Sequence, residues 1–344
     1  MNNITQKYLE ATKHILFKNL RINDEKYIDK KVVLVYDLES PISIELSKGY
    51  ITNLQNKPNS EIINFNETDK DALKQKLLSL EPDSTVILVQ STNFMLDDFR
   101  IRLNLNNAGV GCLEHRHLAY IYEEQVENYA DAIEYKTPYY IELGAKLKTL
   151  SDSAETMTFI CNDGSTLRVT GGFEDMKLND GNFDGRSRGG NFPIGENFTE
   201  AKNFENVNGE LTIYAYPDDK LQVEFVKPFK IKIDKSIVTC DEETCPPTFN
   251  KIMDFIKESE NGEVMFRELG FGLNNGITRE KPLADVNAYE RIAGFHMSLG
   301  KKHQIYRKKL HKDVMQRYHI DIFPDIKEIY IDDTLVFENN KYII

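Results

Sequence analysis

The sequence predicts an α/β protein of two domains, an N-terminal α/β domain with a mostly parallel sheet and a C-terminal α+β domain with an antiparallel sheet. Its 344 residues exceed the usual length of one domain. Buried-strand runs alternate with helical patterns up to about residue 150, and short alternating strands separated by Asn, Asp, Gly and Pro turns follow. We therefore expect domains at 1–150 and 151–344.

The N-terminal half alternates helical and strand patterns. An amphipathic stretch at 4–19 precedes the β-branched run VVLVY at 32–36. A second buried-strand run, TVILVQ at 85–90, lies between helical patterns at 68–80 and 92–104. This alternation is typical of parallel strands joined by crossover helices. Neither strand run is followed by G-x-G-x-x-G, so no dinucleotide site is predicted.

The C-terminal half has the pattern of an antiparallel sheet. A long helical pattern at 120–148 ends the first domain, and TMTFICNDGSTLRVT at 156–170 then predicts a hairpin with its turn at Asp163 and Gly164. The segments GELTIYAY, KLQVEFV and FKIKI continue the strand pattern. We expect this sheet to carry the functional site.

Composition excludes several classes of protein. With 43 Lys and Arg against 55 Asp and Glu, the net charge of -12 argues against a nucleic-acid-binding surface. No window approaches 18 consecutive apolar residues, which argues against a membrane span, and the first residues lack a signal-peptide pattern. These observations predict a cytoplasmic protein with reduced thiols. Cys240 and Cys245 lack the second cysteine pair of a structural zinc site.

Oxygen- and nitrogen-bearing side chains in the second half form a candidate metal site. Its members are Glu196, Glu268, His296, His319 and Asp321. The strand pattern YHIDIF places His319 and Asp321 on one face. Glu268 ends a strand beside Gly270 and Gly272, where the backbone can closely approach a ligand. Such a set suits a pair of divalent ions, with zinc, cobalt, manganese or magnesium as candidates.

Each candidate also has a purely structural interpretation. His296 is expected on a helix at about 287–299, on an apolar stripe, where a buried core histidine is an alternative to a ligand. Glu290 could form a helix-capping pair with Asn287 instead of acting in catalysis. The cluster Glu-His-Arg-His at 114–117 is expected at the surface or in a domain contact, because its histidines would not converge.

Four motifs, in this order, resemble the aminopeptidase S/T family of metallo-aminopeptidases: NFPIGENFTEA, ELGFGLNNGI, ERIAGFHMSLG and YHID. The likeness covers most of residues 188–323. It implies a homodimer of two-domain chains whose C-terminal domain binds two divalent metals and removes N-terminal residues from peptides. No G-x-S-x-G, P-loop or H-E-x-x-H motif supports another hydrolase class.

The resemblance also implies roles for single residues. The metal ligands would be Glu196, Glu268, His296, His319 and Asp321, with Glu268 as a possible bridge. The family has a tyrosine seven residues after the histidine, whereas this chain has His303 there and Tyr306 three positions later. Either Tyr306 or His303 could stabilise an oxyanion, and Glu290 or Glu268 could transfer a proton to the leaving amine.

Two further interpretations stay open. The ring-opening 2,5-dihydroxypyridine dioxygenases resemble the same family, so the scaffold could instead hold a single iron ion with fewer carboxylate ligands. A non-catalytic relative with a degraded site is the third interpretation, motivated by the displaced tyrosine.

Overall fold

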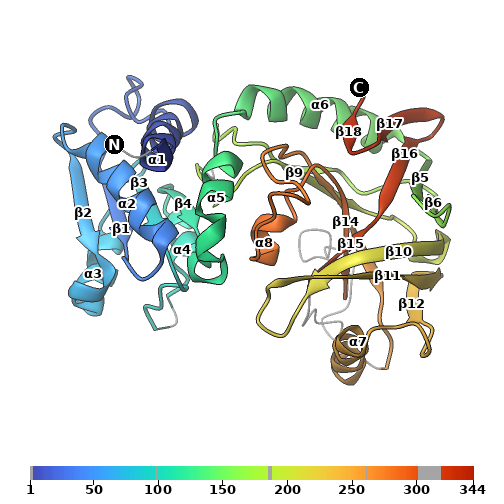
Figure 1. The fold of residues 1–344 in the computed structure, drawn as a ribbon. Helices are drawn as coiled ribbons and strands as arrows, with labels where there is room; N and C mark the ends of the chain where they lie inside the picture. The colour runs from blue at the N-terminus through green and yellow to red at the C-terminus, as the bar shows by residue number, and fades with distance from the viewer. Residues whose placement is uncertain (1–2, 98, 185–187, 261, 301–318) are drawn as a thin grey trace. The chain divides into compact units, whose positions relative to one another are not determined.

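The computed structural model describes residues 3–97, 99–184, 188–260, 262–300 and 319–344 (Figure 1). The chain divides into two compact units. Unit 1 comprises Met1–Pro138, Gly181–Ile194 and Gly276–Ala288, and unit 2 comprises Tyr139–Asp180, Gly195–Asn275 and Tyr289–Ile344. The expected boundary near residue 150 falls within helix α6 (Thr137–Ser153).

Unit 1 contains the predicted parallel sheet, with strand order β2-β1-β3-β4-β8 and parallel pairing throughout. Its strands are β1 (Val32–Tyr36), β2 (Ser60–Asn64), β3 (Thr85–Val89), β4 (Gly111–His115) and β8 (Asn191–Phe192). The β-branched runs of β1 and β3 are buried, as parallel strands with covered faces require. Both predicted strands are confirmed.

The helices of unit 1 are α1 (Asn3–His14), α2 (Pro41–Leu54), α3 (Lys70–Leu78), α4 (Ile101–Asn107) and α5 (Val126–Ala132). A π-helical turn at Ile15–Asn19 extends α1, so the amphipathic stretch at 4–19 is confirmed as helical. Helix α2 begins where Ser40 and Ser43 form a capping box, with Pro41 in the first turn.

Two helix predictions have the wrong limits. Helix α4 begins at Ile101, and the described residues of 92–100 do not belong to it. The continuous helix expected at 120–148 is instead a 3₁₀ turn at Glu123–Gln125, then α5, a non-helical break and α6. Sequence periodicity predicts that a helix is present more reliably than it predicts where the helix begins and ends, and both errors are of the second kind.

Unit 2 contains a large antiparallel sheet in the order β18-β17-β16-β5-β6-β10-β15-β14-β13-β9-β7, with β11 and β12 continuing from β10. Its strands are β5 (Thr156–Cys161), β6 (Thr166–Thr170), β7 (Lys177–Asn179), β9 (Glu196–Glu200), β10 (Val207–Pro217), β11 (Val223–Asp234), β12 (Ile237–Cys240), β13 (Phe266–Gly272), β14 (Gly294–Leu299), β15 (Ile320–Pro324), β16 (Ile326–Ile331), β17 (Thr334–Glu338) and β18 (Lys341–Tyr342). Helices α6 and α7 (Pro247–Ser259) also belong mainly to this unit. The predicted hairpin is confirmed, because β5 and β6 pair in antiparallel register.

The prediction of a helix at 287–299 is wrong. The structure has a short helix α8 (Val286–Tyr289) and then strand β14, which carries His296 and pairs with β13 and β15. Every residue of β14 is buried. A strand covered on both faces lacks the alternation that would distinguish it from a buried helix, which is why periodicity misled here.

The surface interpretation of residues 114–117 is also wrong for its histidines. His115 is fully buried, with its ring nitrogens 2.8 Å from the hydroxyls of Tyr50 and Tyr129, and His117 is buried as well. The four cysteines are free, as expected. Among the described residues, no helix has the length and apolar character needed to cross a bilayer.

Candidate metal centre

Four adjacent strands of unit 2, in the order β9-β13-β14-β15, carry the candidate ligands. In the register of β9 and β13, Glu196 lies opposite Gly272 and Glu200 lies opposite Glu268. Side chains on a strand alternate between faces, so these positions share one face of the sheet. Glu268 therefore lies within β13, not at its far end as the sequence suggested.

The other two strands add ligands to the same face. His296 of β14 lies opposite Gly270 of β13, and Ser298 lies opposite Asp321 of β15. His319 immediately precedes β15. The sheet register thus gathers side chains that are far apart in the sequence.

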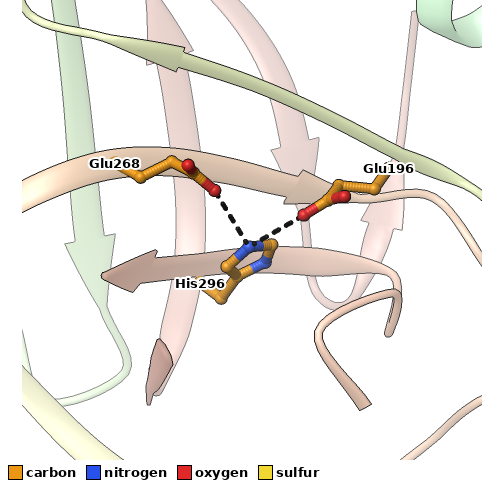
Figure 2. A group of neighbouring side chains, drawn as sticks. All are labelled: Glu196, Glu268 and His296. Atoms are coloured by element: carbon orange, nitrogen blue, oxygen red, sulfur yellow. Dashed lines mark ion pairs between the residues drawn. The ribbon is translucent and has the colours of Figure 1, made fainter. Parts of the chain in front are cut away.

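Gly270 makes room for the imidazole of His296. A Cβ atom at position 270 would lie 2.0 Å from His296 Nε2, so any side chain there would displace the ring. Because position 270 has no side chain, the ring lies across β13 between two carboxylates (Figure 2). His296 Nε2 is 3.3 Å from Glu196 Oε1 and 3.9 Å from Glu268 Oε1.

The described residues form three overlapping groups whose ligand atoms lie within 4.8 Å of one another. The groups are Glu196, Glu268 and His296; Glu268, His319 and Asp321; and Glu290, His296 and Asp321. They bring together all five predicted ligands and add Glu290, which the sequence suggested as a proton carrier. Glu268, His296 and Asp321 each belong to two groups, so they form the centre of the cluster.

His296 provides an independent indication that the cluster could bind a cation. Its side chain is 1% exposed, yet neither ring nitrogen makes a hydrogen bond to any residue that the structure describes. A buried imidazole normally has a partner for at least one nitrogen. A metal ion between these carboxylates and His296 would supply that partner, and the oxygen and nitrogen donors suit a divalent ion.

Burial and mutual charge shift the pKa values of this cluster in opposite directions. Burial lowers the pKa of His296, but Glu196 and Glu268 outweigh that effect and raise it to about 10. Burial raises the pKa of Glu290 well above its usual value. For Glu268 and Asp321 burial also favours the neutral form, but His296 and His319 respectively outweigh it and lower both pKa values. Glu290 is therefore the carboxyl group best able to hold a proton, and Glu268 and Asp321 are ionised.

Both ring nitrogens of His319 have close partners. Its Nε2 lies 2.8 Å from Asp321 Oδ1, and its Nδ1 lies 2.6 Å from Nη1 of Arg267. A guanidinium group can only donate, so His319 Nδ1 accepts. Arg267 thereby fixes the orientation of the imidazole beside Asp321.

Three charged residues of the cluster were missed by the sequence analysis: Glu200, Arg267 and Arg291. Arg267 and Glu200 are fully buried and form an ion pair, with 3.3 Å between Nε and Oε1. Arg291 Nη1 lies 2.7 Å from Glu196 Oε2 and also contacts Glu290. A signal existed, since each arginine is adjacent in sequence to a candidate carboxylate, in R-E at 267–268 and E-R at 290–291.

Other site predictions have mixed outcomes. His303 and Tyr306 lie outside the described residues, so their roles stay predictions. The capping pair of Asn287 and Glu290 is wrong, because Asn287 lies inside α8 and its side chain contacts Asp285 and the ring of His117. Glu290 instead belongs to a ligand group.

Comparisons with known proteins identify the fold. No protein-family model and no curated protein sequence matches the chain. Among solved structures, the 2,5-dihydroxypyridine dioxygenase from Pseudomonas putida KT2440 has a TM-score of 0.65 at 15% identity, covering 98% of this chain and 97% of its own. Wild-type AmpT from Thermus thermophilus has a TM-score of 0.59 at 12% identity, covering 98% and 99%. Each of these two structures shares the two-domain α/β fold with this chain over nearly its full length.

Proposed function

We propose that the chain is a metal-dependent aminopeptidase that releases N-terminal residues from peptides. Support comes from the four motifs that resemble the aminopeptidase S/T family and from the fold shared with AmpT. The observation that carries the proposal is the convergence of Glu196, Glu268, His296 and Asp321 on one face of four adjacent strands, with His296 buried and lacking a hydrogen bond to any described residue.

The chemistry of peptide hydrolysis matches this donor set. A divalent ion, when bound, lowers the pKa of a water molecule from about 15.7 towards about 7 and polarises a carbonyl group as a Lewis acid. Its ligands would be drawn from Glu196, Glu268, His296, His319 and Asp321.

The remaining steps belong to the protein's own residues. Glu290, whose pKa is raised by burial, would hold the proton at a carboxyl oxygen and pass it to the leaving amine. The surplus of carboxylates over arginines offers an ion pair to the free α-amino group of a peptide. His303 or Tyr306 keeps the expected role of stabilising the oxyanion.

Hydrolysis of amino-acid anilides tests the proposal. The protein loaded with cobalt, zinc or manganese should release the aniline group, and a chelator should abolish the activity until metal is restored. Glu268→Gln and Asp321→Asn should each lower kcat/KM at least about 100-fold. As a matched control, Glu328→Gln changes a carboxylate of the same sheet outside the ligand groups and should leave activity unchanged. A metal-loaded protein inactive on a broad panel of peptides and anilides contradicts the proposal.

A second candidate function is a ring-opening dioxygenase with one iron ion. It is favoured by the fold shared with the dihydroxypyridine dioxygenase and by the composition of the cluster. Asp321 belongs to one group with His319 and to another with His296, and two histidines with one carboxylate are the ligands of many non-haem iron oxygenases. Oxygen uptake by the Fe(II)-loaded protein with 2,5-dihydroxypyridine, without anilide hydrolysis, would favour this function.

A further inference from the structure

We propose that the guanidinium group of Arg291 takes the place of a second cation, so that the cluster binds one divalent ion and not two. This inference rests on the metal dependence proposed above, and it concerns the number of ions, not the reaction. The expectation from sequence is two ions, because the residues resemble a two-metal site.

Arg291 already neutralises part of the ligand set. Its Nη1 lies 2.7 Å from Glu196 Oε2 and also contacts an oxygen of Glu290. These carboxylates come from two different ligand groups, and both are buried. The guanidinium is itself buried, at 5% exposure, so it acts as a fixed charge inside the cluster and not as a solvated side chain.

The backbone holds Arg291 in this position. Its carbonyl oxygen accepts a hydrogen bond of 2.9 Å from the amide of Asn274, and the next residue forms a bridge with Asn274. Gly272 permits this approach, since a Cβ there would lie 1.9 Å from the carbonyl oxygen of Ile292. Gly272 also lies opposite Glu196 in the strand register. Because Gly272 has no side chain, the backbone next to Arg291 can approach β13 at the position of that carboxylate.

A second ion beside Glu196 would meet two obstacles. It would lie near a positive charge in a buried environment, where repulsion is poorly screened. It would also compete with the guanidinium for carboxylate oxygens of Glu196 and Glu290 that already form ion pairs with it. Glu268, His319 and Asp321 form the one ligand group among the described residues that contains neither carboxylate partner of Arg291, so this group remains available to one ion.

The number of bound ions tests the inference. Wild type and three variants would be saturated with Co(II), dialysed, and analysed for metal per chain by mass spectrometry, with titration calorimetry as a second measurement. Arg291→Met removes the charge, whereas Arg291→Lys keeps it. Arg188→Met is the matched control, because Arg188 is also buried but belongs to unit 1, donates to the backbone carbonyls of Asp83 and Leu20, and is in none of the ligand groups.

The expected result is one ion per chain in wild type, Arg291→Lys and Arg188→Met, and two in Arg291→Met. Two ions in wild type would overturn the inference, as would one ion in a folded Arg291→Met protein. If Arg291→Met does not fold, anomalous scattering from Co(II) in wild-type crystals decides: a single peak in the cluster supports the inference, and two peaks overturn it.

The same experiment separates this inference from the proposed function. Two ions in a wild type that cleaves anilides would reject only the role of Arg291. No bound ion in any of the proteins would reject both.

Discussion

Gly270 shows how the absence of a side chain can build a site. The imidazole of His296 occupies the space where a Cβ at position 270 would be. We therefore predict that Gly270→Ala displaces the ring, costs about 1–3 kcal/mol in the free energy of unfolding through overpacking, and weakens metal binding at least about 10-fold. Calorimetric titration with Co(II) measures the affinity.

Gly164→Ala is the control for that change. Gly164 lies in the β5–β6 turn with φ +85°, and a methyl group there would meet no atom within 4 Å. This variant should lose about 1 kcal/mol of stability through backbone strain and keep its metal affinity. Equal metal affinity in both variants would refute the steric role of Gly270.

His296 also predicts how metal binding depends on pH. Its pKa in the metal-free protein is about 10, above the unfolded value of 6.5. The proton therefore stabilises the metal-free fold fully below pH 6.5, and this contribution is lost as the pH rises towards 10. An ion must displace the same proton, so apparent affinity should rise about tenfold per pH unit between pH 6.5 and 8.5. Titrations at five pH values measure the slope, and a flat profile would contradict it.

At the scale of elements, a bulge in β13 links two strands through a buried ion pair. Phe266 pairs with Leu299 and Leu269 with Met297, so one extra residue lies between them on β13. The bulge contains Arg267, whose guanidinium pairs with Glu200 of β9. Bulges near active sites commonly redirect a side chain in this way.

A double-mutant cycle tests this link. Arg267→Met should destabilise the protein by about 3–5 kcal/mol, because it leaves the charge of Glu200 buried without its guanidinium. The double variant Arg267→Met with Glu200→Leu should recover most of that loss, since an apolar pair replaces both charges. Denaturant unfolding gives the free energies. Additive losses in the double variant would show that the pair does not act as a unit.

The elements also show what sequence can and cannot predict. Strands β1 and β3 and the hairpin of β5 and β6 followed from β-branched runs and from an Asp-Gly turn, both of which are local signals. Strand β14 did not, because its burial on both faces removes the alternation that marks a strand. All five expected ligands nevertheless lie in the three ligand groups. They were chosen from the residue types and order of the four motifs, which did not depend on assigning residues 287–299 to a helix or a strand.

Arg267, Arg291 and Glu200 could not have been placed from the sequence. The pairing of Glu200 with Arg267 depends on strand register and on the bulge, which bring a residue of β9 next to one of β13. The position of Arg291 depends on its backbone contact with Asn274. Charge adjacency in the sequence could have suggested a pairing but not its geometry.

At the scale of the whole molecule, the two units have separate cores. A buried cluster including Val33, Val86 and Leu105 stabilises unit 1, while the candidate metal ligands all belong to unit 2. The parallel and antiparallel sheets confirm the predicted fold class, which depends only on the order of element types. The homodimer and the cytoplasmic location stay predictions, because they concern surfaces and surroundings outside the single chain.

The division into units predicts a local response to metal. An ion that binds only the folded state stabilises what it binds by about 2.7 kcal/mol at a concentration 100 times its Kd. Hydrogen exchange should therefore slow in β9, β13, β14 and β15 when Co(II) is added, because opening these strands would release the ion. The amides of β1 and β3 belong to a separate core and should exchange at unchanged rates. Asp321→Asn supplies the control, since it should abolish the effect in unit 2. Equal slowing in both sheets would show that the two units unfold as one cooperative body. No slowing in either sheet would contradict the proposal of a metal centre in unit 2.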